Sequence, residues 1–144
     1  MENITKTNLE TAKEYMSEYN YTLVLAKGNK ILTSHDKGIK PLLDFCEFEV
    51  SFSGYACADK VVGKGAALLY VYLGITDVYA KTISKHALTV LKNNNINVEY
   101  DTLVDKIKDR TGKGFCPIET SVLNCNDPNE ALTLIKNKLE ELSQ

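Results

Sequence analysis

The chain has 144 residues, of which 44% are hydrophobic and 25% charged, and its formal net charge is −2. This size and composition fit one globular domain with its own core. The small negative charge gives no electrostatic reason to expect binding to nucleic acid or to a membrane surface. The longest apolar run, residues 66–73, is too short to cross a bilayer, and the N-terminus lacks an apolar signal region. We therefore expect a cytoplasmic protein.

The four cysteines, Cys46, Cys57, Cys116 and Cys125, form no Cys-x-x-Cys pair. A structural zinc site is not expected, because such sites use closely spaced thiolates. A disulfide framework is not expected either, because the chain is long enough for an ordinary core and carries no export signal. We expect reduced thiols, and neither a metal nor any other cofactor.

The first third of the chain is predicted to contain two helices and a hairpin. Residues 7–10, Thr-Asn-Leu-Glu, have the pattern of a capping box and begin a helix that we expect to end near Tyr19. The β-rich residues 21–26 and 30–34 flank a Lys-Gly-Asn turn, which predicts a β-hairpin. A short helix with proline in its first turn is expected over residues 38–45.

A helix over residues 60–73 follows in the predicted order. Apolar and small residues recur there at helical spacing, and Gly74 is a stop signal. The preceding residues 54–59 are expected to form a loop. Lys60 and Lys64 would then lie one turn apart on the same helix.

The remaining elements alternate between strands and helices, in the order strand 76–83, helix 84–91, strand 96–100, helix 103–110, helix 116–123 and helix 127–142. This alternation predicts the α/β class with a three-layer α/β/α architecture. The hairpin makes the sheet mixed rather than purely parallel. We expect residues 1–144 to form a single domain, with an N-terminal helix in residues 1–20 and the core and C-terminal helix in residues 21–144.

The order of these elements, and three short segments, are similar to known proteins. A hairpin followed by helix, strand, helix and strand is the core order of the cytidine-deaminase-like fold. Residues 58–67, with Ile83-Ser84 and the segment 116–119, resemble a small, poorly characterised prokaryotic family placed in that superfamily. The resemblance covers about residues 21–138 and implies a cytidine-deaminase-like α/β/α core.

The sequence departs from the active members of that superfamily at the zinc site. Those members carry a His/Cys-x-Glu motif at one helix start and Pro-Cys-x-x-Cys at the next, which supply the zinc ligands and a proton-shuttling glutamate. Asp59-Lys60 stands at the first place and residues 83–86, Ile-Ser-Lys-His, at the second. Because a catalytic zinc needs three protein ligands, we expect a protein without zinc that has lost hydrolytic deamination.

Asp59, Lys60, Gly63 and Lys64 form the first group of candidate ligand-binding residues. At a helix start, free backbone N–H groups and the dipole favour an anion, and the two lysines would add positive charge. Glycine at position 63 would let a ligand come close. A simpler interpretation stays open, with Asp59 as an N-cap, solvated lysines, and the glycine as a contact between packed helices.

Ser84, His86, Cys116 and Glu119 complete the candidate site. Ser84 and His86 stand at a predicted helix start and could hydrogen-bond a polar ring, although a histidine there is more often a surface residue. Cys116 precedes a proline at another helix start, where the dipole favours a thiolate. Glu119 could line the same pocket or complete a capping box, and the structural alternative for Cys116 is a small buried residue.

From these residues we expect a domain that binds a small anionic or nucleotide-like ligand, the nucleotide being what the resemblance implies. Two alternatives stay open. Cys116 could be the nucleophile of a thiol-dependent enzyme, although a nucleophile usually needs a positioned base. The domain could instead be structural, or form a homo-oligomer, without any ligand.

Overall fold

The structure, a computed structural model, describes residues 6–48, 51–109 and 111–143. In this part of the chain one sheet is formed by β1 (Leu23–Lys27), β2 (Lys30–Ser34), β3 (Ala56–Val62), β4 (Asp77–Ser84) and β5 (Asn97–Val104). The strand order is β2-β1-β3-β4-β5. β1 is antiparallel to both of its neighbours, whereas β3, β4 and β5 run parallel. The expected mixed sheet is therefore confirmed.

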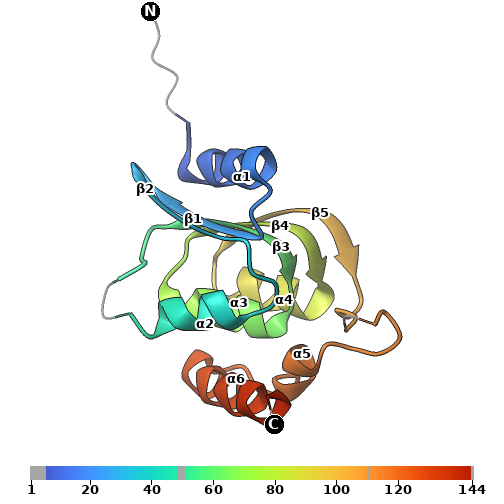
Figure 1. The fold of residues 1–144 in the computed structure, drawn as a ribbon. Coiled ribbons are helices and arrows are strands. Elements are labelled where there is room, and N and C mark those ends of the chain that lie inside the picture. The colour runs from blue at the N-terminus through green and yellow to red at the C-terminus, as the bar shows by residue number, and fades with distance from the viewer. Residues whose placement is uncertain (1–5, 49–50, 110, 144) are drawn as a thin grey trace, which may run out of the picture.

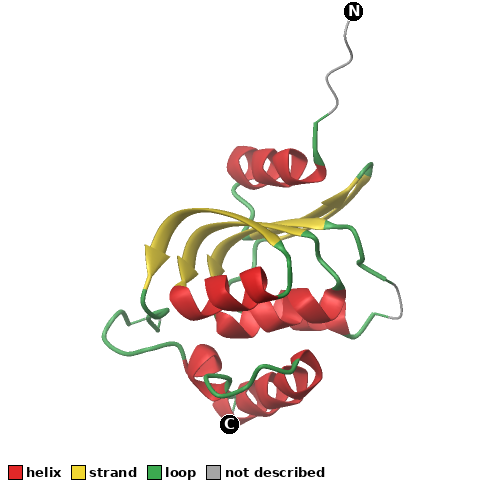
Figure 2. Cartoon of the chain, turned by 180° about the vertical axis from the view of Figure 1, so that it is seen from behind, coloured by secondary structure: helices red, strands yellow, loops and turns green. Residues whose placement is uncertain are grey.

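Helices cover both faces of this sheet. The described helices are α1 (Asn8–Tyr19), α2 (Lys40–Cys46), α3 (Lys64–Leu73), α4 (Lys85–Asn93), α5 (Pro117–Ser121) and α6 (Pro128–Leu142). Figure 1 and Figure 2 show α1 alone on one face, α2, α3 and α4 on the other, and α5 and α6 as a further layer beyond them. The α/β class and the helices on both faces follow the prediction, whereas the further layer was not predicted.

The predicted capping box begins α1. The Thr7 hydroxyl accepts a hydrogen bond from the Glu10 backbone N–H at 3.1 Å, and the Glu10 carboxylate accepts one from the Thr7 backbone N–H at 3.1 Å. The helix packs on the sheet through a small apolar cluster that consists of Ala12, Met16, Val24, Ala26, Ala58 and Tyr79. This cluster holds α1 over one part of the sheet face.

The main core lies on the other side of the sheet, and α3 is at its centre. Eight of the ten residues of α3 are buried, because the sheet covers one side of the helix and α6 the other. Gly65 permits this contact, since a Cβ there would lie 2.9 Å from Ile118 Cγ2 and 3.3 Å from Ile135 Cδ1. Gly65 is thus a point of close contact between α3 and the α5–α6 layer.

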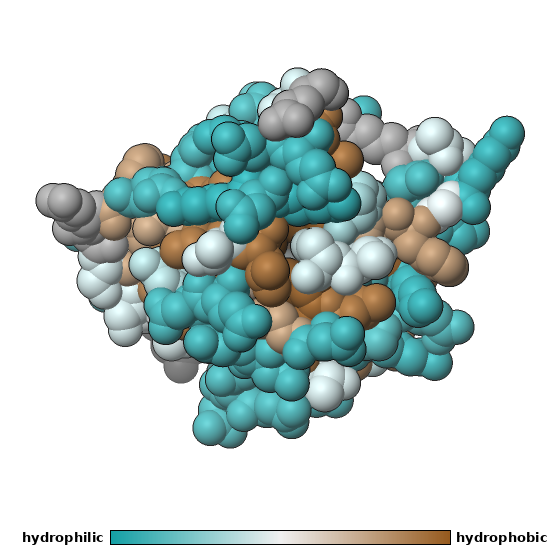
Figure 3. All heavy atoms as spheres, turned by 90° about the horizontal axis from the view of Figure 1, so that it is seen from below, coloured by the Kyte–Doolittle hydropathy of each residue, from teal (hydrophilic) through white to brown (hydrophobic). Residues whose placement is uncertain are grey.

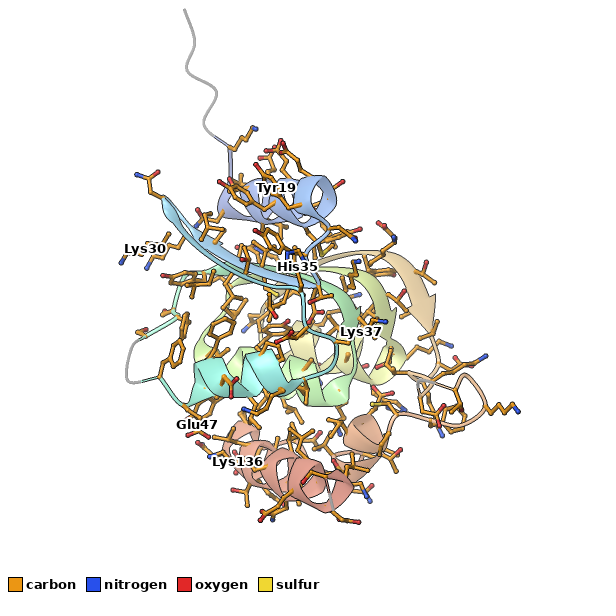
Figure 4. The ribbon with its side chains drawn as sticks, viewed as in Figure 1. Tyr19, Lys30, His35, Lys37, Glu47 and Lys136 are labelled. Atoms are coloured by element: carbon orange, nitrogen blue, oxygen red, sulfur yellow. The ribbon has the colours of Figure 1, made fainter. Side chains whose placement is uncertain are left out.

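The α5–α6 layer closes the core on its outer side. Ala131 and Ile135 are the buried residues of α6, and the face of the layer turned away from the core is mostly polar, with an apolar strip across it (Figure 3). At one end Lys136 forms an ion pair of 2.5 Å with Glu47, next to the C-terminus of α2 (Figure 4). Both of these side chains are exposed, so the pair contributes little to stability.

Two predicted helices are wrong. The segment 60–73 is not one helix, because residues 56–62 form the central strand β3 and α3 begins at Lys64. The predicted helix 103–110 is also absent from the described residues, since β5 continues to Val104 and Lys108 pairs with Phe115 in an isolated bridge. In both places residues with helical spacing of apolar groups are held in extended backbone by pairing with neighbouring strands.

Candidate functional site

A buried carboxylate lies where the parallel strands end. Glu119, on α5, is 3% exposed, and its Oε2 accepts hydrogen bonds from the Lys64 backbone N–H at 2.7 Å and from Ser84 Oγ at 2.5 Å. Its Oε1 accepts a third bond from the Ile107 backbone N–H at 2.9 Å. One side chain thereby links the starts of α3 and α4 to the loop after β5.

The local sequence explains this arrangement. Gly63 is the N-cap of α3 and has no side chain to bond the free N–H groups, so Glu119 bonds one of them from another element. Ser84 caps α4, accepting from the Ala87 N–H at 3.1 Å while its hydroxyl donates to Glu119. A Cβ at position 63 would lie 3.2 Å from Glu119 Oε2, which explains the glycine.

The structure therefore brings together four of the residues that we selected from the sequence: Gly63, Lys64, Ser84 and Glu119. The Lys64 backbone N–H and the Ser84 hydroxyl both donate to the Glu119 carboxylate, and Gly63 lies next to that carboxylate. Glu119 is not missed by sequence reasoning, but its partner Ile107 is, because a backbone N–H in a loop gives no sequence signal.

Asp59 and Lys60 lie elsewhere, on the two faces of β3. The Asp59 carboxylate accepts a hydrogen bond from Tyr70 OH at 2.5 Å, on the side of the sheet that α3 covers. Burial raises the pKa of Asp59 to about 7, and the hydrogen bond from Tyr70 opposes that shift. Lys60 Nζ donates to Asn20 Oδ1 at 2.8 Å, at the end of α1. Lys60 and Lys64 are thus not one helical turn apart, as expected, but on opposite sides of the sheet.

Lys64 and His86 line a small pocket beside α4. Its volume is about 320 Å³, and its lining residues, which define the α4 pocket, are Lys64, His86, Thr89, Val90, Asn93, Asn94 and Asn126. The asparagines were not among the residues selected from the sequence, because a run such as residues 93–95 is typical of a helix end. Their signal was present, since several amides in one short segment can both donate and accept hydrogen bonds.

The Lys64 side chain is buried at the edge of the α4 pocket. The residue is only 6% exposed, and its Nζ donates to the Leu123 carbonyl at 2.7 Å. Within the described ranges, no ion pair within 4.0 Å involves this ammonium group. An ammonium group has three N–H donors, so the carbonyl leaves donors for another acceptor.

Cys116 is partly buried and is the N-cap of the short helix α5. Its backbone N–H donates to the Ile107 carbonyl at 2.8 Å, and its carbonyl accepts from the Thr120 N–H at 3.1 Å. Among the residues that the structure describes, no hydrogen bond joins its thiol to a histidine or carboxylate. No positioned base is therefore seen for thiol catalysis.

In residues 6–48, 51–109 and 111–143 no three His, Cys, Asp or Glu side chains gather as a metal-binding group. No helix in that part of the chain combines the length and the apolar character needed to cross a bilayer.

Comparison with known proteins identifies the family. No curated protein matches the chain. The chain is similar to a solved structure of a DUF1893 family protein (TM1506) from Thermotoga maritima, with 28% identity and a TM-score of 0.83 over 96% of this chain and 95% of that one. Nothing in these comparisons ties the chain to the cytidine-deaminase-like superfamily, so our assignment to a family of that superfamily is wrong. Residues 11–139 match the model of TM1506, a domain of unknown function (DUF1893), and the chain belongs to this family.

Proposed function

We propose that the protein binds a small anionic ligand in the α4 pocket. The observation that carries the proposal is the Lys64 ammonium group, which is buried, bonded to one carbonyl and without an ion-pair partner among the described residues. Burying a charge is costly unless it is paired. An anionic group in the pocket would pair with Lys64 and use its remaining donors.

The other lining residues favour a ligand with a polar ring, such as a nucleoside monophosphate. His86 and Thr89 offer a ring nitrogen and a hydroxyl, and Asn93 and Asn126 offer amides that donate and accept at once. Val90 adds an apolar contact. The volume of about 320 Å³ suits a small molecule rather than a polymer. This proposal depends on the pocket alone and not on any deaminase relationship.

The experiment is calorimetric titration with AMP and CMP, with adenosine and cytidine as uncharged counterparts. The wild-type protein should bind a monophosphate more tightly than its nucleoside. Lys64→Met, which keeps the side-chain length and removes the charge, should weaken monophosphate binding at least tenfold, and His86→Gln should also weaken it. Lys92→Met removes a charge from α4, outside the pocket lining, and should change binding less than twofold.

Two results would contradict the proposal. The first is no binding of either monophosphate by the folded wild-type protein, which would favour the structural or oligomeric alternative. The second is equal binding by Lys64→Met and Lys92→Met, which would place the anion elsewhere. His86→Gln protects the test against misfolding of the Lys64 variant, because His86 is only partly buried.

A further inference from the structure

A second and larger hollow lies on the other face of the sheet, beside α1. Its volume is about 480 Å³, and it lies between α1 and the outer surfaces of β3, β4 and β5. The lining residues that matter here, which define the α1 groove, are Lys13, Ser17, Asn20, Lys60, Tyr79 and Lys81. The sheet separates the α1 groove from the α4 pocket, as the positions of α1 and α4 in Figure 1 show.

Two lysines of the α1 groove are direct neighbours on the sheet. The register that pairs Asp59 with Ala80 and Val61 with Thr82 places Lys60 of β3 beside Lys81 of β4. Like charges side by side on one sheet face repel each other and destabilise the sheet. An anion bound between the two side chains would remove the repulsion.

The negative charges around the α1 groove have other partners. Asp101 also lines the groove and lies beside Lys81 in the register of β4 and β5; it accepts a hydrogen bond from Tyr79 OH at 2.6 Å, and this neutral donor leaves its charge in place. Glu99 pairs with Lys13 at 2.7 Å, and Glu14, which also lines the groove, pairs at 2.6 Å with a lysine that precedes α1. The two ion pairs neutralise Glu14, Glu99 and the Lys13 ammonium, whereas Asp101 lies beside Lys81 on the side away from Lys60.

Lys60 and Lys81 are left as the cations of the groove. Lys60 Nζ is oriented by Asn20 Oδ1, a neutral acceptor. Within the part of the chain that the structure describes, neither ammonium has a carboxylate within 4.0 Å. Two adjacent unpaired ammonium groups match an anion that carries two charges.

We propose that the α1 groove is a second binding site and takes a phosphate monoester. The phosphoryl group lies between Lys60 and Lys81, and the Ser17 hydroxyl and the Asn20 amide provide further donors. Lysine binds phosphate as a point charge, so two of them neutralise the dianion without a bidentate geometry. The rest of the groove, along Tyr79, has room for the organic part of the ester.

The test is an NMR titration of the whole chain with phenyl phosphate at pH 7.5. Amide signals of β3, β4 and the end of α1 should shift. Lys60→Gln and Lys81→Gln should each weaken binding at least tenfold. Lys30→Gln, which removes one charge at the tip of the β1–β2 hairpin (Figure 4), and Lys64→Met should change it less than twofold. Binding should weaken severalfold at pH 5.5, because the second phosphate pKa is about 6.

The proposal fails if Lys30→Gln weakens binding as much as Lys81→Gln, since net charge alone would then explain it. It also fails if the shifted amides lie outside the groove. A second measurement needs no ligand: Lys60→Gln should melt at or above the temperature of the wild-type protein, because it relieves the repulsion with Lys81 and leaves Lys81 beside Asp101. A lower melting temperature would contradict the repulsion on which the proposal depends.

Discussion

At the scale of single residues, the described structure depends on carboxylates that are removed from water. Glu119 accepts three hydrogen bonds and connects α5 to the starts of α3 and α4. A carboxylate buried in this way is stabilised by its donors, and removal of one partner leaves the others unpaired. Glu119 is thus a structural tie between segments that are 55 and 35 residues apart in sequence.

Asp59 is a carboxylate of a different kind, because no ion pair within the described residues involves it. Its main partner is the hydroxyl of Tyr70, which is fully buried. Burial therefore dominates and raises the pKa of Asp59 from 3.8 to about 7. Part of the Asp59 side chain reaches water, which reduces the effect of this shift on stability.

The pH dependence of stability should show this group. Below pH 3.8 the Asp59 carboxyl is protonated in both the folded and the unfolded chain. Between about pH 4 and 7 the unfolded chain loses the proton first, so the free energy of unfolding falls as pH rises and levels off above 7. The complete shift corresponds to about 4 kcal/mol at most. Asp59→Asn should abolish this fall, as measured by urea denaturation at pH 5 and pH 8.

A matched variant makes that measurement specific. Asp44→Asn changes an exposed carboxylate on α2 and should keep the pH profile of the wild-type protein. If Asp59→Asn and the wild-type protein lost the same stability between pH 5 and pH 8, the raised pKa of Asp59 would be contradicted.

At the scale of elements, most helices and strands were predicted from the sequence in the right order, but the central strand of the sheet was not. The hairpin, α1 with its capping box, β4 and α6 each carry a strong local signal, and all were predicted within a few residues. The central strand β3 was missed, because its Ala-Cys-Ala-Asp-Lys segment has small and polar residues instead of β-branched ones. The small side chains suit a strand that is covered on both faces. Such coverage depends on how other elements pack on the sheet, so the local sequence does not reveal it.

The mistaken helix prediction at the end of β3 also limited what could be predicted of the candidate site. Residues at true helix starts, such as Ser84, were placed correctly, and they do converge with Glu119. Lys60 was predicted on a helix one turn from Lys64, but it lies in β3, where successive side chains point to opposite faces, and its side chain bonds Asn20 on the α1 side. The groove beside α1, and the meeting of Asn126 with Asn93 and Asn94, depend on contacts between distant segments, which sequence spacing does not contain.

Packing between elements leads to a prediction for α3. Gly65→Ala should lower the free energy of unfolding by about 1–2 kcal/mol, although alanine favours a helix, because its Cβ would meet Ile118 Cγ2 at 2.9 Å. Denaturation of the single variants and of the double variant with Ile118→Ala gives the coupling. The cost of Gly65→Ala should largely disappear in the Ile118→Ala background. An equal cost in both backgrounds would show that the contact with Ile118 is not the reason for a glycine at position 65.

At the scale of the whole molecule, the layers depend on one another. α3 lies between the sheet and α6, so both of its faces are covered only when both neighbours are present. Glu119 adds polar bonds between α5 and the starts of α3 and α4. The two hollows lie on opposite sides of this stack, each at a boundary between layers. Binding in either one would therefore stabilise the folded state as a whole.

The dependence of the layers predicts that the α5–α6 layer unfolds together with the core. Ile135 is fully buried, and Ile135→Ala should lower the free energy of unfolding by about 2–5 kcal/mol. Far-UV circular dichroism reports the helices, including α6, whereas tyrosine fluorescence does not report α6, which has no tyrosine, but does report the core through Tyr70. If the layers unfold together, the two signals should give coincident transitions in urea. Leu142→Ala, in the same helix at a residue that is 52% exposed, should stay within about 0.5 kcal/mol of the wild-type protein. If helical signal were lost before the tyrosine signal, α6 would be a separate unit, and the core would not need it to stay folded.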